Sequence, residues 1–426
     1  MKIKIEDLKR ILENHGHYLR KDCENWRSMR ANLSNMNLSG IDLSGMNLSD
    51  ANLRGANLRN SNLSNANLYK AYLKGADLEN SKMDRINLEK ACLDDTNLEG
   101  ANLEYANLIY ANLENSKMIK AYLKRANLRD AKLEGANLEA INLSEANLYN
   151  ANLRYANLES ANLSEANLYW ANLYKANLYD ANLFEANLKN TELSYTNLEG
   201  AYFVNANLYK ANLTSANLKY ANLEDANLSD TNLMDARLVE ANLKNTILYR
   251  AYLFRANLEG ANLRKTYLFR TNLKSANLRN AILLGADLEQ ANLLNSKLFG
   301  ANLEGANLYD TIISDQSKIK GEMLTQDIIG YKKCMHDIIV TLKIPRGAIV
   351  FSINGSKCRT NKVIVINMED FNGNRVNRAI AMYNKYMSYY VGDEITDYTF
   401  NCQYNIECSG GIHFFRTKEE AKNFHI

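Results

Sequence analysis

Long apolar segments are missing from this chain of 426 residues. No run approaches the roughly 20 apolar residues that a membrane-spanning helix needs. The N-terminal stretch MKIKIEDLKRILENHGHYLR is charged and amphipathic, and it lacks the apolar core and cleavage site of a secretory signal. Proline, which occurs once, is also scarce. We therefore expect neither a membrane span nor a membrane partner.

Cysteine is sparse and scattered, with six residues in the whole chain. They are Cys23, Cys92, Cys334, Cys358, Cys402 and Cys408. They form no dense disulfide pattern, which favours a reducing, cytoplasmic setting.

Motifs for catalysis and for phosphate binding are also missing. The chain has no Walker, Rossmann or nucleophile-elbow pattern. The net charge is only +3, and neither residues 1–30 nor residues 316–426 hold the concentrated basic stripe that phosphate binding requires. We expect no enzyme activity, no cofactor and no direct contact with nucleic acid.

The chain does contain a five-residue period, which runs without insertion from Ala31 to Asp315. Of its 57 pentapeptides, 53 have Leu at the third position. The first position is small except at Met36, Ile41, Met46, Ile86 and Ile141. The second is usually Asn, and the fourth and fifth vary and carry most of the charge.

This pattern predicts short strands joined by turns. Positions one and three lie on the same side of an extended chain, so the small residue and Leu face inward while Asn faces outward. A period of five fits no helix. Stacked coils, about 4.8 Å apart, would bury each Leu layer under the next.

The aromatic residues indicate the length of one coil. Twelve stand at the fourth position, and seven of these differ by multiples of twenty. They are Tyr69, Tyr149, Tyr169, Tyr209, Tyr249, Phe269 and Tyr309. A coil of four pentapeptides would place all seven in one stripe. The second-position Lys residues are never twenty apart, so mostly neutral Asn fills the outward stack and can form amide ladders.

The A(N/D)LXX pattern, as in Ala151-Asn152-Leu153, resembles the pentapeptide-repeat family over residues 31–315. The resemblance implies an all-β solenoid, a right-handed quadrilateral β-helix with four pentapeptides per coil. This chain would then have about fourteen coils, a length of roughly 65–70 Å at the strand spacing above.

The sequence predicts a capping element at each end of the repeat array. Residues 1–30 read as an N-terminal helical cap, in which residues 5–14 place Ile5, Leu8, Ile11 and Leu12 on one helical face. His15 and His17 are expected at its surface. Residues 316–426 read as a small, mainly β domain with strands near 337–344, 348–353 and 362–368, ending in a short helix within 416–424 that begins with a Thr cap.

Four segments of the C-terminal domain resemble a domain of uncharacterised function found attached to pentapeptide arrays. They are GYKKC at 330–334, KIPRGA at 343–348, SKCRTNK at 356–362 and ECSGGIHFF at 407–415. Here Cys334, Cys358, Cys402, Cys408 and His413 could assemble a zinc site, although no C-x-x-C knuckle is present. A Cys408–His413 nucleophile pair and idle, buried cysteines are the other interpretations.

Some members of the family bind DNA gyrase or topoisomerase by imitating the shape and charge of duplex DNA. That alternative needs a strongly acidic rod, but residues 31–315 carry a net charge of only about −4. One stripe of Glu residues favours this alternative, although Lys117, Lys120 and Lys219 interrupt it. It contains Glu79, Glu99, Glu139, Glu159, Glu199 and Glu259.

The aromatic stripe, with Trp170 beside it, is the other candidate interaction face. Aromatic rings dominate interface energetics, although rings one coil apart could simply stack and stiffen the rod. We predict a non-enzymatic scaffold or protein-interaction module, with the C-terminal domain as the specificity element. Its protein partner and oligomeric state are not encoded in a readable motif.

Overall fold

The computed structural model describes residues 3–303, 305–312, 322–323, 326–346, 348–352, 357–360, 362–382, 388–396 and 412–424. They belong to two units, Met1–Asn262 and Leu263–Ile426. Neither α-helix among these residues has the length and apolar character needed to cross a membrane.

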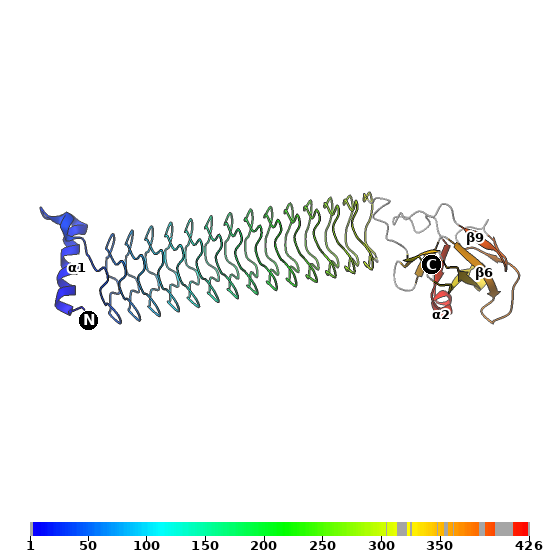
Figure 1. The fold of residues 1–426 in the computed structure, drawn as a ribbon, viewed down its shortest axis with the longest axis horizontal. Coiled ribbons are helices and arrows are strands. Elements are labelled where there is room, and N and C mark those ends of the chain that lie inside the picture. The colour runs from blue at the N-terminus through cyan, green and yellow to red at the C-terminus, as the bar shows by residue number, and fades with distance from the viewer. Residues whose placement is uncertain are drawn as a thin grey trace. The chain divides into compact units, whose positions relative to one another are not determined.

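The repeats of the first unit form a stack of coils in which residues twenty apart pair as parallel bridges (Figure 1). The pairs run from Asn32↔Asn52 to Asn242↔Asn262. The Leu33 N–H donates to the Asn52 carbonyl at 2.7 Å, and the Asn52 N–H donates to the Ala31 carbonyl at 2.9 Å. This pairing agrees with the twenty-residue coil expected from the aromatic residues.

The interior of the stack is built from the third position. Every third-position side chain of the first unit is at most 1% exposed, including the bulkier Phe203. Each buried Leu contributes roughly 1.5–3 kcal/mol. The chain turns at positions four and five: Asn35 has a φ of +55°, and the Met36 N–H donates to the Leu33 carbonyl at 3.3 Å. Asn, Asp and Gly adopt positive φ at low cost, which explains their frequency at position five.

The outward Asn side chains make two kinds of hydrogen bond. The Asn167 Nδ2 donates to the Asn147 Oδ1 at 3.1 Å, and the Asn187 Nδ2 donates to the Asn167 Oδ1 at 2.9 Å. These bonds confirm the expected amide ladder. The same oxygen also accepts a local backbone bond, as when the Tyr169 N–H donates to the Asn167 Oδ1 at 3.3 Å. Asn therefore links coils and fixes each turn.

Helix α1 (Ile5–Arg20) and the 3₁₀ turn η1 (Trp26–Met29) precede the repeats. The Ala31 N–H, in the first coil, donates to the His15 Nδ1 at 3.1 Å. His15 is only 1% exposed and stacks on Tyr18, so its expected surface position is wrong. Ile5 is 67% exposed and lies off the packed face, whereas Leu8 is buried as expected.

In the second unit the same bridges continue from Tyr267↔Asp287 to Asn292↔Ile312. An antiparallel sheet follows, with strand order β1-β4-β5-β10-β2-β3-β6-β9. The strands are β1 (Glu322–Met323), β2 (Ile328–Cys334), β3 (Ile338–Ile344), β4 (Ile349–Ser352), β5 (Lys357–Thr360), β6 (Lys362–Glu369), β9 (Glu394–Thr396) and β10 (Ile412–Phe415). The short strands β7 (Ala379–Ile380) and β8 (Ser388–Tyr389) form a separate pair, and the 3₁₀ turn η2 (Met335–Asp337) joins β2 to β3.

Helix α2 (Lys418–Lys422) follows β10 (Figure 1). Thr417 and Glu420 cap it reciprocally, which confirms the Thr cap expected from the sequence. One core cluster holds Ala421 of α2 with Ile339 and Phe415 of the sheet. On β2, Gly330 is required because a Cβ atom there would collide with the Phe414 ring. These contacts confirm a mainly β C-terminal domain.

Candidate functional site: interaction faces and the C-terminal recess

The densest part of the aromatic stripe lies at Tyr149, Tyr169 and Trp170. Ring centroids are 5.7 Å apart for Tyr149–Tyr169, 5.0 Å for Tyr169–Trp170 and 5.9 Å for Tyr149–Trp170. Trp170 remains 51% exposed. An open recess of about 320 Å³ adjoins this aromatic cluster, and Tyr149, Arg129, Asn147 and Asn167 line it. The three rings and the recess are therefore a candidate contact surface.

Elsewhere in the stripe a cation at position five covers the ring that precedes it. The distances from charge to ring centroid are 5.1 Å for Lys70–Tyr69, 5.1 Å for Lys210–Tyr209, 4.8 Å for Arg250–Tyr249 and 5.1 Å for Arg270–Phe269. Tyr309 is 70% exposed. The predicted stripe is therefore chemically mixed, because some of its rings lie under cations and two of them stack on each other.

A second aromatic row escaped the sequence prediction. Tyr174 meets Tyr155 and Tyr195 edge-on, with centroids 5.8 Å apart in both pairs. The Arg154 guanidinium lies 5.3 Å from Tyr155 and 5.5 Å from Tyr174. The predicted stripe contains position four alone, whereas here position-five rings meet a position-four ring of an adjacent coil. A search for aromatic pairs nineteen and twenty-one residues apart would have found this row.

The acidic face is partly neutralised by its own neighbours. Arg59 forms an ion pair with Glu79, and Lys117 forms one with Glu99. The Glu99 carboxylate raises the pKa of Lys117. Glu159 and Glu199 accept hydrogen bonds from the Asn ladder at 3.3 and 3.0 Å. The remaining candidates on this face are Glu139, which is exposed, and Glu259.

The C-terminal domain has its own open recess, of about 380 Å³. Its lining residues are Lys333, Cys334, Met335, His336, Asp337, Met382 and Phe424. The Lys333 ammonium group donates to the carbonyls of Lys422 and Phe424, both at 3.3 Å, so it anchors the end of α2. His336 and Asp337, in the three-residue turn between β2 and β3, both have positive φ, a conformation that is uncommon for residues other than Gly.

The structure places the candidate zinc ligands unevenly. Cys334 and Cys358 lie in the same apolar core, and burial raises the pKa of the Cys334 thiol to about 11. Cys358 pairs across the sheet with Phe414, so the preceding His413 points to the opposite face. Cys402 and Cys408 lie outside the described residues, and the zinc interpretation stays a prediction.

Models of known protein families match both parts of the chain. The model for pentapeptide repeats, in units of eight copies, matches overlapping segments from residue 29 to residue 315. The chain belongs to the pentapeptide-repeat proteins. Residues 318–421 of this pentapeptide-repeat protein match a second model, described as a family of unknown function (DUF5758).

Solved structures of other pentapeptide-repeat proteins are similar to part of the chain. HetL, involved in heterocyst differentiation regulation in the cyanobacterium Nostoc sp. strain PCC 7120, is 35% identical over 54% of this chain and 89% of its own, with a TM-score of 0.21. Rfr23 from the cyanobacterium Cyanothece 51142 is 25% identical over 43% of this chain and 88% of its own, with a TM-score of 0.11.

QnrB1, a plasmid-mediated fluoroquinolone resistance protein, is 18% identical over 51% of this chain and 90% of its own, with a TM-score of 0.32. A comparison with curated proteins finds no match. Since every TM-score is low, the assignment rests on the repeats themselves. Pentapeptide-repeat proteins fold as right-handed β-helices and serve as structural or interaction modules, generally without enzymatic activity.

Proposed function

We propose that this pentapeptide-repeat protein is a non-enzymatic scaffold that holds a protein partner on the aromatic cluster of Tyr149, Tyr169 and Trp170. The exposure of Trp170 carries the proposal. Its ring is 51% exposed although its backbone has a φ of +61°, a conformation that bulky side chains disfavour. The turn itself does not require Trp, since Asn150 and Asn190 occupy the equivalent turns one coil away.

Several features favour a protein over other partners. The cluster combines two half-buried Tyr rings, an exposed Trp and the neighbouring Arg129, and Tyr, Trp and Arg are enriched at the energetic centres of protein interfaces. The rings are already stacked in the free chain, so binding would cost little side-chain entropy. The C-terminal domain, with its separate recess, would supply further specificity.

Imitation of DNA is the alternative function. The ion pairs of Arg59 with Glu79 and of Lys117 with Glu99 weaken this acidic face as a mimic of regularly spaced phosphates. A supercoiling assay with purified gyrase separates the two functions. Inhibition of gyrase that survives substitution of Trp170 would favour the mimic.

The test of the scaffold uses two matched substitutions, Trp170→Asn and Tyr220→Asn. Both positions are the fifth of a repeat, both have a φ of +61°, and their side chains are 51% and 48% exposed. Tyr220 lies on the opposite side of the coil, outside the aromatic cluster. Photo-crosslinking in native extract would measure partner capture, and thermal melting would measure stability.

We expect Trp170→Asn to lose capture without lowering the melting temperature, and Tyr220→Asn to retain capture. Equal loss in both variants, or a lower melting temperature that accounts for the loss in Trp170→Asn, would contradict the proposal. The second result would assign the rings a purely stabilising role.

The proposal includes a finer architecture. The 57 repeats would make about fourteen coils between an N-terminal cap of residues 1–30 and a domain of residues 316–426. The scaffold would work in a reducing, cytoplasmic setting, without a cofactor, a nucleic-acid partner or a membrane partner. The free thiols of Cys23, Cys92, Cys334 and Cys358 support a reducing setting.

A further inference from the structure

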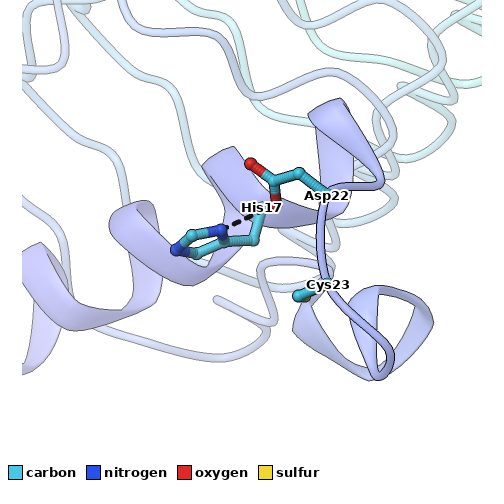
Figure 2. A group of neighbouring side chains, drawn as sticks. All are labelled: His17, Asp22 and Cys23. Atoms are coloured by element: carbon cyan, nitrogen blue, oxygen red, sulfur yellow. Dashed lines mark hydrogen bonds and ion pairs between the residues drawn. The ribbon is translucent and has the colours of Figure 1, made fainter.

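Three possible metal ligands come together where α1 ends, and nothing in the proposed scaffold uses them. They are His17, in the last turn of the helix, and Asp22 and Cys23, in the turn that follows (Figure 2). Their ligand atoms all lie within 4.8 Å of one another. The His17 Nδ1 is 2.8 Å from the Asp22 Oδ1.

The backbone fixes these three residues in place. Lys21 adopts a left-handed conformation, with φ of 53° and ψ of 37°, and its N–H donates to the His17 carbonyl at 2.8 Å. This bond ends the helix and folds Asp22 back toward the His17 ring. The Trp26 N–H then donates to the Cys23 carbonyl at 3.2 Å. These two bonds therefore fix the backbone that carries the three side chains.

We propose that His17, Asp22 and Cys23 form a zinc site. Imidazole nitrogen, carboxylate oxygen and thiolate are the donors that Zn²⁺ takes in tetrahedral sites. Zinc–ligand bonds of about 2.0–2.3 Å place donor atoms roughly 3.2–3.8 Å apart, so small side-chain movements from the present positions suffice. Three protein ligands leave the fourth position to water.

Arg20 fits this arrangement as an outer partner of the carboxylate. Its Nε donates to the Asp22 Oδ2 at 2.6 Å, which leaves Oδ1 facing His17. Ligating carboxylates are commonly held by such a second hydrogen bond. The Arg20 Nη2, 3.3 Å from the His17 Nδ1, would give up that contact to the metal. The Cys23 thiol, now 3.5 Å from the Met29 sulfur, would release its proton on binding.

The experiment titrates the reduced, chelator-treated full-length protein with Co²⁺ and then with Zn²⁺. We expect one Co²⁺ per chain, an intense sulfur-to-cobalt charge-transfer band, and its loss when Zn²⁺ is added. Cys23→Ser should abolish the band. His17→Gln and Asp22→Asn should weaken binding by at least about tenfold, the lower end of what loss of an outer-sphere partner costs.

Cys92→Ser is the matched control. Cys92 is also partly exposed, and its sulfur lies 3.0 Å from the Asp94 carboxylate. Among the described residues, however, it belongs to no group of three possible metal ligands. This variant should keep the full band. Since the proposed ligands are not buried, the variants should fold, and an unchanged melting temperature in chelator would verify this.

A band that persists in Cys23→Ser, or the absence of any band, would overturn the inference. Persistence together with loss in Cys402→Ser would assign the metal to the C-terminal domain instead. Hydrogen exchange gives a second readout, since bound Zn²⁺ should slow exchange at the end of α1. This inference is independent of the proposed scaffold, because the aromatic cluster plays no part in it.

Discussion

Acidification should release α1 from the first coil, because the contact depends on neutral His15. The ring is buried, and its Nδ1 accepts the Ala31 N–H at 3.1 Å. Protonation would turn Nδ1 into a donor that faces another donor. It would also place a charge in the interior, where a charge is strongly disfavoured unless it is paired.

The burial of His15, together with the groups around it, defines the pH range in which the contact weakens. Desolvation by burial is the largest effect and lowers the pKa of His15, with a smaller contribution in the same direction from Arg30. The Ser49 backbone and Asp50 act in the opposite direction. Because the pKa in the folded state is depressed, the unfolded segment binds more protons below about pH 6.5. The contact is fully stable above that pH and weakens as the pH falls.

The free energy of opening α1 can change with pH only as steeply as the uptake of one proton allows. Between about pH 6.5 and the folded pKa, the free energy of opening α1 should fall by up to about 1.4 kcal/mol for each pH unit. The hydrogen bond to Ala31, which protonation breaks, accounts for roughly 1 kcal/mol of the whole loss in the free energy of opening. Hydrogen exchange of residues 5–20, corrected for the intrinsic effect of pH, measures the opening directly.

The control is His15→Asn, whose side-chain oxygen can reach the position of Nδ1 and does not titrate. This variant should show no pH-dependent opening of α1, whereas His15→Ala should open at every pH because the Ala31 N–H is left without an acceptor. Identical pH profiles for the natural chain and His15→Asn would refute the reasoning.

Three further predictions concern the coils and the sheet. Asn167→Leu removes the hydrogen bond to Asn147 and the acceptor of the Tyr169 N–H, so it should cost about 1–3 kcal/mol of stability. Its melting temperature should be lower than that of a variant changed at an exposed fourth position. Gly330→Ala forces a Cβ against Phe414 and should destabilise the C-terminal sheet by about 1–3 kcal/mol in urea unfolding. The Cys334 thiol, with its pKa raised to about 11, should resist alkylation at pH 8 until the domain unfolds; rapid labelling of the folded chain would contradict its burial.

Part of the proposed interaction surface could be predicted from the sequence because it repeats with the fold. Seven aromatic residues at multiples of twenty predicted a stripe, and Tyr149 does stack on Tyr169. The cations that cover other rings were not foreseen. Their positions depend on side-chain torsions between adjacent turns, which the backbone period does not specify. The row of Tyr155, Tyr174 and Tyr195 was missed for another reason, because it joins position-five rings to a position-four ring and the predicted stripe contains position four alone.

The C-terminal domain shows how far local patterns reach. The segments that became β3, β4, β6 and α2 were predicted, because alternating apolar residues and a capping box are local features. The position of β10 between β5 and β2 was not, since it joins segments more than fifty residues apart. The collision that keeps Gly330 free of a side chain follows from that pairing.

By itself, the sequence determined which side chains face inward, where each turn falls and which family the repeats belong to. Each coil buries its Leu layer against near-copies of itself, so local sequence and packing carry the same information. Only the tertiary structure decided that His15 is buried, that His17, Asp22 and Cys23 meet, and that Gly330 lies under Phe414. Each of these contacts occurs once in the chain and does not repeat with the coils, so the periodic sequence pattern does not predict it.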